Sequence, residues 1–159
     1  MASTSDGPQQ AIDESFMRLA LTQAESADFP FGAIIVRDGV IIARGRNAGK
    51  SLQDPTAHGE MMAIRDFVSR RPGAELAGAT IYTTGEPCPM CMGALLWCGV
   101  TRVVYAASIP RIAKYMNQIG ISCEALADAA PFATVEIVGG VLADEAVALF
   151  EKKPGTSIE

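Results

Sequence analysis

The sequence predicts an α/β protein in which a mixed sheet has helices on both faces. The first observation is that apolar runs of strand length alternate along the chain with longer runs whose apolar residues recur at helical spacing. The second is that the first two strand-length runs are separated only by a turn, which predicts a hairpin. With 159 residues, of which 49% are hydrophobic, the chain is long enough for one domain with a sizeable core.

The first quarter of the chain predicts a helix followed by that hairpin. Residues 1–8 are small and polar and are expected to form a loose tail. Residues 31–36 and 40–43 are short apolar runs on either side of a turn at 37–39, so they predict two buried strands. Between the tail and the hairpin, residues 9–27 predict an amphipathic helix, whose buried stripe would contain Ile12, Phe16, Leu19 and Ala20.

The middle of the chain predicts a loop, a helix and a strand. Residues 44–55 are polar and contain glycine and proline, which predicts the loop. Thr56 is the expected N-cap of the next helix. Residues 70–78 break this helix, and residues 79–84 have the length and composition of a strand. The buried face of the helix would carry Met61, Ile64 and Val68.

The rest of the chain predicts two further strands among three helical runs. A proline and a glycine at positions 154 and 155 are expected to end the last helix. The expected elements are a small apolar helix at 92–97, a strand at 100–107, a short helix within 110–121, a strand at 134–138 and a closing helix at 143–152.

The composition weighs against several classes of protein. The net charge of −5 disfavours nucleic acid as a partner, because phosphate backbones are bound by clustered Lys and Arg. No apolar run approaches the roughly 18 residues that a membrane span needs. Residues 1–10 have no basic end and no apolar run, so a secretion signal is not expected and the expected location is cytoplasmic. There, four cysteines are expected to be metal ligands or core residues.

Two short motifs carry the candidate chemistry. Cys88 and Cys91 follow Pro87 and lie three residues apart, on one face of a helix start, where the helix N-terminus lowers a thiol pKa. His58 opens another helical run, two residues before Glu60. One histidine and two thiolates are a three-ligand set for zinc, which leaves one of its four positions for water. His-x-Glu followed by Pro-Cys-x-x-Cys is the signature of the zinc deaminases.

The alternative is a zinc site that only stabilises the fold, which would need a fourth protein ligand. Cys98 follows Cys91 by seven residues, about 10 Å along a helix, so it cannot easily reach the same ion. Spacing does not exclude Cys123, which lies far from any paired ligand, and both of these cysteines are predicted to be core residues. Glu60 could be the fourth zinc ligand, but no coordination position would then be left for water. As a general acid and base, it would instead move protons between zinc-activated water and the substrate.

The match to a known family extends beyond these motifs. The runs 29–36, 54–60 and 86–93, with Asn47 between the first two, resemble the cytidine-deaminase-like superfamily of zinc deaminases, and within it bacterial guanine deaminases and nucleoside deaminases. The resemblance implies a three-layer α/β/α sandwich with a mixed five-stranded sheet, one zinc ion per chain and a homodimer or higher homo-oligomer. The implied boundaries are a flexible tail at 1–8, a single zinc deaminase domain at 9–153 and a C-terminal tail at 154–159.

The resemblance also implies roles for individual residues. His58, Cys88 and Cys91 would bind the zinc ion, and Glu60 would be the catalytic proton shuttle. Asn47 would donate or accept a hydrogen bond at the substrate ring, although its position after a glycine also suits a simple turn residue. The other residues expected to contact substrate are Phe29, Ala57, Gly59 and Glu86.

The predicted reaction is hydrolytic deamination of a free nucleobase, with guanine, giving xanthine and ammonia by attack of zinc hydroxide, as the first candidate. Residues 108–115 lack the carboxylate, and residues 151–159 the aromatic side chain, that guanine deaminases of this type carry. Cytosine or another small aminated heterocycle or nucleoside is therefore the alternative. A tRNA adenosine deaminase ranks lower because the C-terminal third has few basic residues, and a non-catalytic zinc scaffold would have no need of Glu60.

Overall fold

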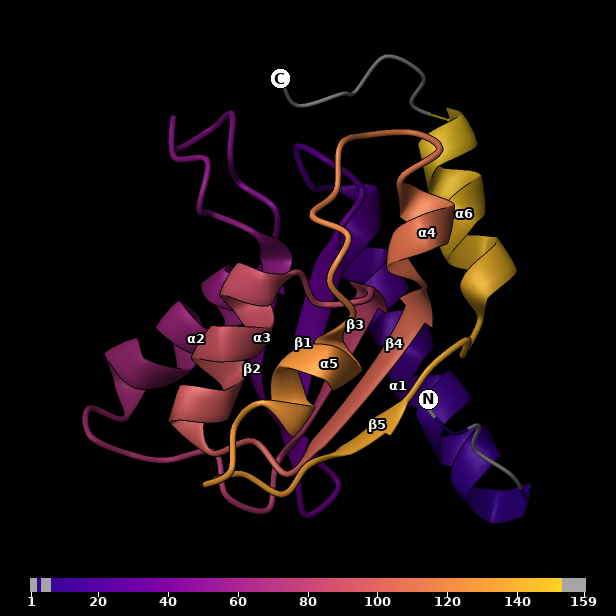
Figure 1. Ribbon diagram of the computed structural model, residues 1–159. Coiled ribbons are helices and arrows are strands. Elements are labelled where there is room, and N and C mark those ends of the chain that lie inside the picture. The colour runs from indigo at the N-terminus through magenta and orange to yellow at the C-terminus, as the bar shows by residue number, and fades with distance from the viewer. Residues whose placement is uncertain (1–2, 4–6, 153–159) are drawn as a thin grey trace.

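The computed structural model describes Ser3 and residues 7–152, which form a five-stranded sheet between two layers of helices (Figure 1). The strand order is β2-β1-β3-β4-β5, with β1 antiparallel to both of its neighbours and the last three strands parallel. The predicted mixed-sheet sandwich is therefore confirmed. The elements are α1 (Gly7–Glu25), β1 (Gly32–Arg37), β2 (Val40–Arg46), α2 (Gly59–Arg70), β3 (Thr80–Gly85), α3 (Pro89–Cys98), β4 (Arg102–Ala107), α4 (Ile109–Ile112), α5 (Cys123–Asp128), β5 (Glu136–Val138) and α6 (Ala143–Lys152).

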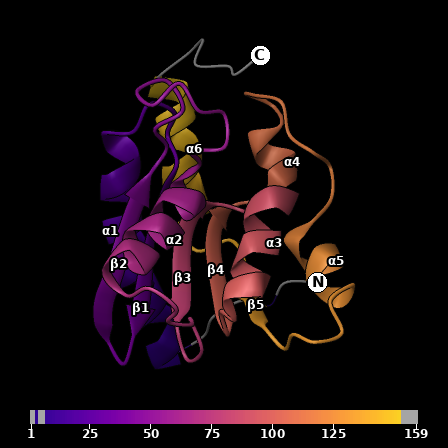
Figure 2. The same cartoon turned by 90° about the vertical axis from the view of Figure 1, so that its left-hand side faces the viewer.

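The helices bury two cores, one on each face of the sheet. Helices α1 and α6 cover one face, and α2, α3 and α5 cover the other (Figure 2). The side chains of consecutive residues in β1 lie in the cores on opposite faces of the sheet, because side chains alternate along a strand. Ile34 packs with Met17 of α1, whereas Ile35 packs with Phe67 of α2. A strand covered on both faces has to be apolar throughout, which is why this run could be recognised in the sequence.

Two glycines allow the helices to approach the sheet closely. A Cβ atom on Gly32 would overlap the carbonyl oxygen of Ala20 in α1, and one on Gly45 would overlap the backbone nitrogen of Ala63 in α2. Since the obstructing atoms belong to the backbone, a larger residue at either position would push the helix away. Gly45 therefore allows α2, which begins next to His58, to lie close against β2.

The buried face of α1 differs from the predicted stripe. Ala20 is buried as expected, but Ile12 and Leu19 are 47% and 43% exposed. The helix presents a face that includes a fully buried carboxylate, and a pattern counted on apolar residues alone could not find it. The buried residues of α1 are Asp13, Met17, Ala20, Leu21 and Ala24.

Asp13 forms a buried ion pair that ties α1 to the sheet. Its two oxygens accept from the guanidinium of Arg102 at 2.7 and 2.8 Å, and Oδ1 also accepts from the Tyr82 hydroxyl at 2.9 Å. Asp13→Asn is expected to lower the free energy of unfolding by about 1.5–3 kcal/mol, because it removes the charge from the hydrogen bonds with Arg102, which would keep the exposed Glu136, at 3.1 Å, as its carboxylate partner. Glu145→Gln, at an exposed pair with Arg18 at 3.9 Å, should cost about 0–1 kcal/mol. Equal losses in urea unfolding would contradict this assignment.

The start of α2 also differs from the prediction. Thr56 is not the N-cap, because its hydroxyl donates to Asp54 Oδ1 at 2.6 Å. His58 takes that position, with an extended backbone and no side-chain capping bond. Val68, which was predicted to be buried, is 38% exposed.

Between β4 and β5 the structure has two short helices where one was predicted. The helix expected within 110–121 is the single turn α4, and α5 was not predicted. Ser122 begins α5, since its hydroxyl accepts from the N–H of Ala125 at 3.1 Å. Residues 113–122 connect α4 to α5 without regular structure, and some of them reach the site described below.

The N-terminal segment is held more firmly at one point than expected. Ser3, within the predicted loose tail, donates its N–H to the carbonyl of Ile137 at 3.1 Å and accepts from the N–H of Gly139 at 3.1 Å. The predicted helix stop and C-terminal tail at 154–159 lie outside the described residues. Of the helices that are described, none has the length and apolar character required to span a membrane.

Candidate active site

The ends of four strands meet at one edge of the sheet. Strands β3 and β4 are parallel, with Gly85 opposite Ala107, so both end at this edge. Strand β1 runs the other way and begins there, where Gly32 pairs with Arg46 at the end of β2. Loops at the carboxyl ends of parallel strands are the usual location of α/β active sites. The residues that flank the four strand ends are Phe31, Asn47, Glu86 and Ser108.

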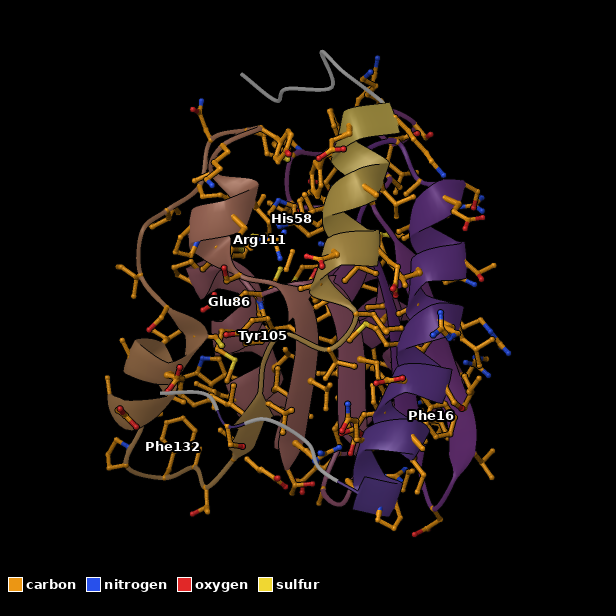
Figure 3. All side chains as sticks on the ribbon, turned by 90° about the vertical axis from the view of Figure 1, so that its right-hand side faces the viewer. Phe16, His58, Glu86, Tyr105, Arg111 and Phe132 are labelled. Atoms are coloured by element: carbon orange, nitrogen blue, oxygen red, sulfur yellow. The ribbon has the colours of Figure 1, made fainter. Side chains whose placement is uncertain are left out.

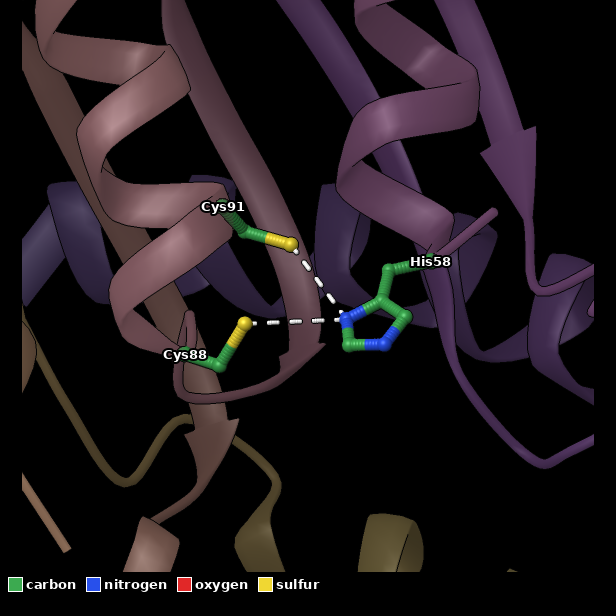
Figure 4. A group of neighbouring side chains, drawn as sticks. All are labelled: His58, Cys88 and Cys91. Atoms are coloured by element: carbon green, nitrogen blue, oxygen red, sulfur yellow. Dashed lines mark hydrogen bonds between the residues drawn. The ribbon is translucent and has the colours of Figure 1, made fainter. Parts of the chain in front are cut away.

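Helices α2 and α3 both begin beside this edge, and each begins with a candidate ligand. His58 is the N-cap of α2, and its carbonyl accepts from Met62 at 2.9 Å. Cys88 is the N-cap of α3, and its carbonyl accepts from Met92 at 2.8 Å. Cys91 follows in the first turn of α3. Figure 4 shows the three side chains pointing toward one another from the two helix starts.

The spacing of these three side chains fits zinc. The Sγ atoms of Cys88 and Cys91 lie 3.6 and 3.5 Å from Nδ1 of His58, and the three atoms lie within 4.8 Å of one another. A tetrahedral ion with Zn–N near 2.0 Å and Zn–S near 2.3 Å places a nitrogen and a sulfur ligand about 3.6 Å apart. Cys98 and Cys123 are not in this cluster. The described cysteines and histidine thus give three ligands and not a closed set of four.

Hydrogen bonds among His58, Cys88 and Cys91 shift the pKa of each side chain. The bond from the Cys91 thiol, followed by a smaller one from His58, lowers the pKa of Cys88 to about 4. The same contact with Cys88 raises the pKa of Cys91, and burial adds to it. The pKa of His58 is raised as well, mainly by the Cys88 sulfur. Zinc needs both sulfurs as thiolates and the imidazole neutral, so binding the metal releases these protons.

Glu60 lies beside the cluster in the first turn of α2 and is buried. Burial, followed by repulsion from the Cys88 thiolate, raises the pKa of Glu60 to about 7. Hydrogen bonds from its own backbone N–H and from Thr83 act in the opposite direction. A carboxyl group with a pKa near neutrality can both accept and release a proton, which suits a general acid and base.

A cavity of about 410 Å³ opens next to this cluster. His58, Glu60 and Cys88 line it at the helix starts, and its other lining residues come from the strand ends and from the segment after α4. Volumes of this order suit a small ligand. The other lining residues are Phe31, Asn47, Glu86, Met116, Asn117, Gln118 and Ile119.

Asn47 lines the cavity with its side chain fixed in place. It is buried, and its Oδ1 accepts from the N–H of Gly49 at 2.9 Å. Its backbone N–H donates to the carbonyl of Phe31, and its carbonyl accepts from Asp28, both at 3.0 Å. The side-chain NH₂ group is therefore the donor that Asn47 can offer to a ligand in the cavity.

Three other residues predicted to contact substrate lie outside the cavity lining. Phe29 belongs to the core, with the Lys50 ammonium 5.1 Å from its ring centroid. Phe31 lines the cavity in its place and packs edge-on against Phe150. Ala57 and Gly59 are buried, and a Cβ on Gly59 would lie 3.3 Å from the Phe31 carbonyl oxygen. The small size of Gly59 thus lets the start of α2 lie against the start of β1.

Residues 116–119 were not identified as part of the site from the sequence. They follow α4 in a segment that was predicted only as a short helix. The one local signal is the pair of amides, Asn117 and Gln118, between the apolar residues Met116 and Ile119. Amide side chains inside an apolar surround are typical of ligand cavities, but this pattern is too common to locate one by itself.

Comparisons with known proteins agree with this geometry. Residues 10–107 match the family model described as the cytidine and deoxycytidylate deaminase zinc-binding region. The chain is 44% identical over 106 residues to the chloroplastic tRNA(adenine(34)) deaminase of Arabidopsis thaliana, a match that covers 64% of this chain and 8% of that protein. It is 43% identical over 99 residues to the guanine deaminase of Bacillus subtilis (strain 168), covering 59% and 64%. The chain thus spans less than two thirds of the length of either relative.

Among solved structures, a mutant of the protein NE0047 in complex with 8-azaguanine is similar to this chain, with a TM-score of 0.79 and 26% identity. The match covers 88% of this chain and 83% of that one. Because it covers 88% of this chain, the similarity includes regions beyond residues 10–107, which the family model matches.

Proposed function

Because the chain belongs to the cytidine and deoxycytidylate deaminase zinc-binding family, we propose that it is a zinc-dependent deaminase that acts on a free aminated nucleobase, with guanine as the first candidate. The products would be xanthine and ammonia. The observation that carries this proposal is the cavity of about 410 Å³, which adjoins the metal ligands and is walled by residues 116–119. A single flat ring system suits a cavity of this size.

The reaction depends on the ligand cluster and Glu60 acting together. His58, Cys88 and Cys91 would hold zinc, which would supply the Lewis acidity that makes water a nucleophile near neutral pH. Glu60, in the first turn of α2 beside the ligands, would take one proton from the attacking water and give it to a ring nitrogen. The same carboxylate would then take the second proton, from the hydroxyl group added to the ring carbon, and give it to the amine, so that the carbonyl forms as the C–N bond breaks and ammonia leaves.

The remaining cavity residues are suited to hold a planar heterocycle. Phe31 offers an aromatic surface, and the NH₂ group of Asn47 can donate to a ring nitrogen or carbonyl. Asn117 and Gln118 each provide an amide with both a donor and an acceptor. Guanine presents both N–H donors and an acceptor oxygen, so amides can pair with it where a carboxylate is lacking. Cytosine and other small aminated rings present similar edges and remain alternatives.

A second candidate substrate is adenosine in tRNA, the substrate class named for the Arabidopsis relative. One feature favours it: a shallow hollow between β2 and α2 is lined by Arg44, Arg46 and Arg65. However, Arg65 lies 3.5 Å from the Asp54 carboxylate, and the net charge of the chain is −5. A polyanion would be expected to need a stronger basic surface.

The substrate proposal is tested by ammonia release from the zinc-loaded protein. The panel contains guanine, guanosine, cytosine, cytidine, adenine and an amino-triazine, and an unmodified tRNA is assayed separately for inosine. Release from guanine alone would support the first candidate. Release from another free ring would keep the mechanism and replace the substrate. Inosine in tRNA without ammonia release from the small molecules would overturn the proposal in favour of the second candidate.

A further inference from the structure

Glu86 is a buried carboxylate in the cavity wall that the proposed reaction does not use. It follows the last residue of β3 and is 6% exposed. Its Oε1 accepts from the backbone N–H of Ile109 and its Oε2 from the backbone N–H of Cys123, both at 2.9 Å. Ile109 is the first residue of α4, and Cys123 is the first residue of α5. In Figure 3, Glu86 lies between these two short helices.

Both N–H groups need an acceptor from outside their own helix. The first N–H groups of a helix have no partner within it, and burying them without one is costly. The N-cap of α4, Ser108, makes no side-chain capping bond, and the side chain of Ser122, the N-cap of α5, caps the N–H of Ala125 and not that of Cys123. One carboxylate therefore satisfies two helix starts, and its negative charge suits the positive end of each.

The segment between these two helix starts contributes the wall of the cavity. Residues 116–119 line it, and Gln118 hydrogen-bonds within the segment, to the carbonyl of Asn117 at 2.8 Å. The segment runs from the N–H of Ile109 to that of Cys123, so the carboxylate of Glu86 joins its two ends. The position of Asn117 and Gln118 over the cavity then depends on this junction.

We propose that Glu86 is a positioning residue that fixes residues 109–123 over the cavity and so sets the affinity for the substrate. Its two oxygens are engaged by backbone donors, whereas Glu60 lies beside the metal ligands and carries the protons. Glu86 lies two residues before Cys88, and the family resemblance implied that it contacts the substrate. The structure assigns it instead to the shape of the substrate cavity.

The first test is the isosteric variant Glu86→Gln. A glutamine keeps one acceptor, but its NH₂ group then faces the second backbone N–H. Zinc content is expected to remain at one ion per chain, KM to rise about tenfold and kcat to stay within about threefold. The matched control is Glu151→Gln, because Glu151 accepts from Tyr115 of the same segment at 3.1 Å but at the surface. This variant should leave both constants unchanged. A fall in kcat with an unchanged KM would overturn the proposal.

The second test uses amide hydrogen exchange in the unaltered protein and needs no substrate. The N–H groups of Ile109 and Cys123 are expected to exchange more slowly than those of Asn117 and Gln118, and this protection should fall in Glu86→Gln for residues 109–123 only. Rapid exchange at Ile109 and Cys123 in the unaltered protein would refute the junction. The kinetic test rests on the proposed function, whereas the exchange test does not, so the two can fail separately.

Discussion

Glu60→Gln is expected to keep one zinc ion per chain and to lose turnover by a factor of at least about 10²–10⁴. Glutamine has almost the same shape as glutamate but cannot take a proton from water and pass it on. The variant should also fold normally, because Glu60 has hydrogen bonds that an amide oxygen can still accept. Metal analysis, thermal unfolding and kcat on the best substrate of the panel measure the three expectations.

A matched control is Glu14→Gln in α1, where Glu14 accepts a surface hydrogen bond from Gln10, and this variant should leave kcat unchanged. Retained turnover in zinc-replete Glu60→Gln would show that another group carries the protons. This experiment also separates an enzyme from a zinc-bound scaffold. A scaffold would be unaffected by the exchange, since it has no proton to move.

Cys88→Ala is expected to lose both stoichiometric zinc and activity. The variant removes one of three ligand atoms that lie within 4.8 Å of one another, and the remaining imidazole and thiol are a poor zinc site. Stability should fall as well, because a metal that binds only the folded state stabilises it by about 2.7 kcal/mol when its concentration is 100 times Kd. Zinc addition should raise Tm for the unaltered protein and not for the variant.

Cys98→Ala is the control for this experiment. Cys98 ends α3, lies outside the ligand cluster and is partly buried, so zinc content and the response of Tm to zinc should both persist. If Cys88→Ala retained one zinc ion per chain, Cys88 would not be a ligand. In that case the geometry of His58 and the two sulfurs would reflect hydrogen bonding alone.

The metal ligands could be predicted from the sequence because each belongs to a local motif. Cys88 and Cys91 are three residues apart at a helix start, so the spacing alone places both sulfurs on one face. His58 and Glu60 share the start of α2 in the same way. Strand and helix order followed from the period of apolar residues, and this is why the layers of the sandwich agreed with expectation.

The shape of the cavity was decided by contacts between residues far apart in the chain. Glu86 accepts from Cys123, and Asp13 pairs with Arg102, so neither the hydrogen-bond donors to Glu86 nor the buried face of α1 could be found in a local pattern. Asn117 and Gln118 reach the site only because the ends of their segment are held at the sheet edge. Local spacing fixes which atoms can bind the metal, whereas the substrate cavity depends on tertiary hydrogen bonds, whose partners no sequence window contains.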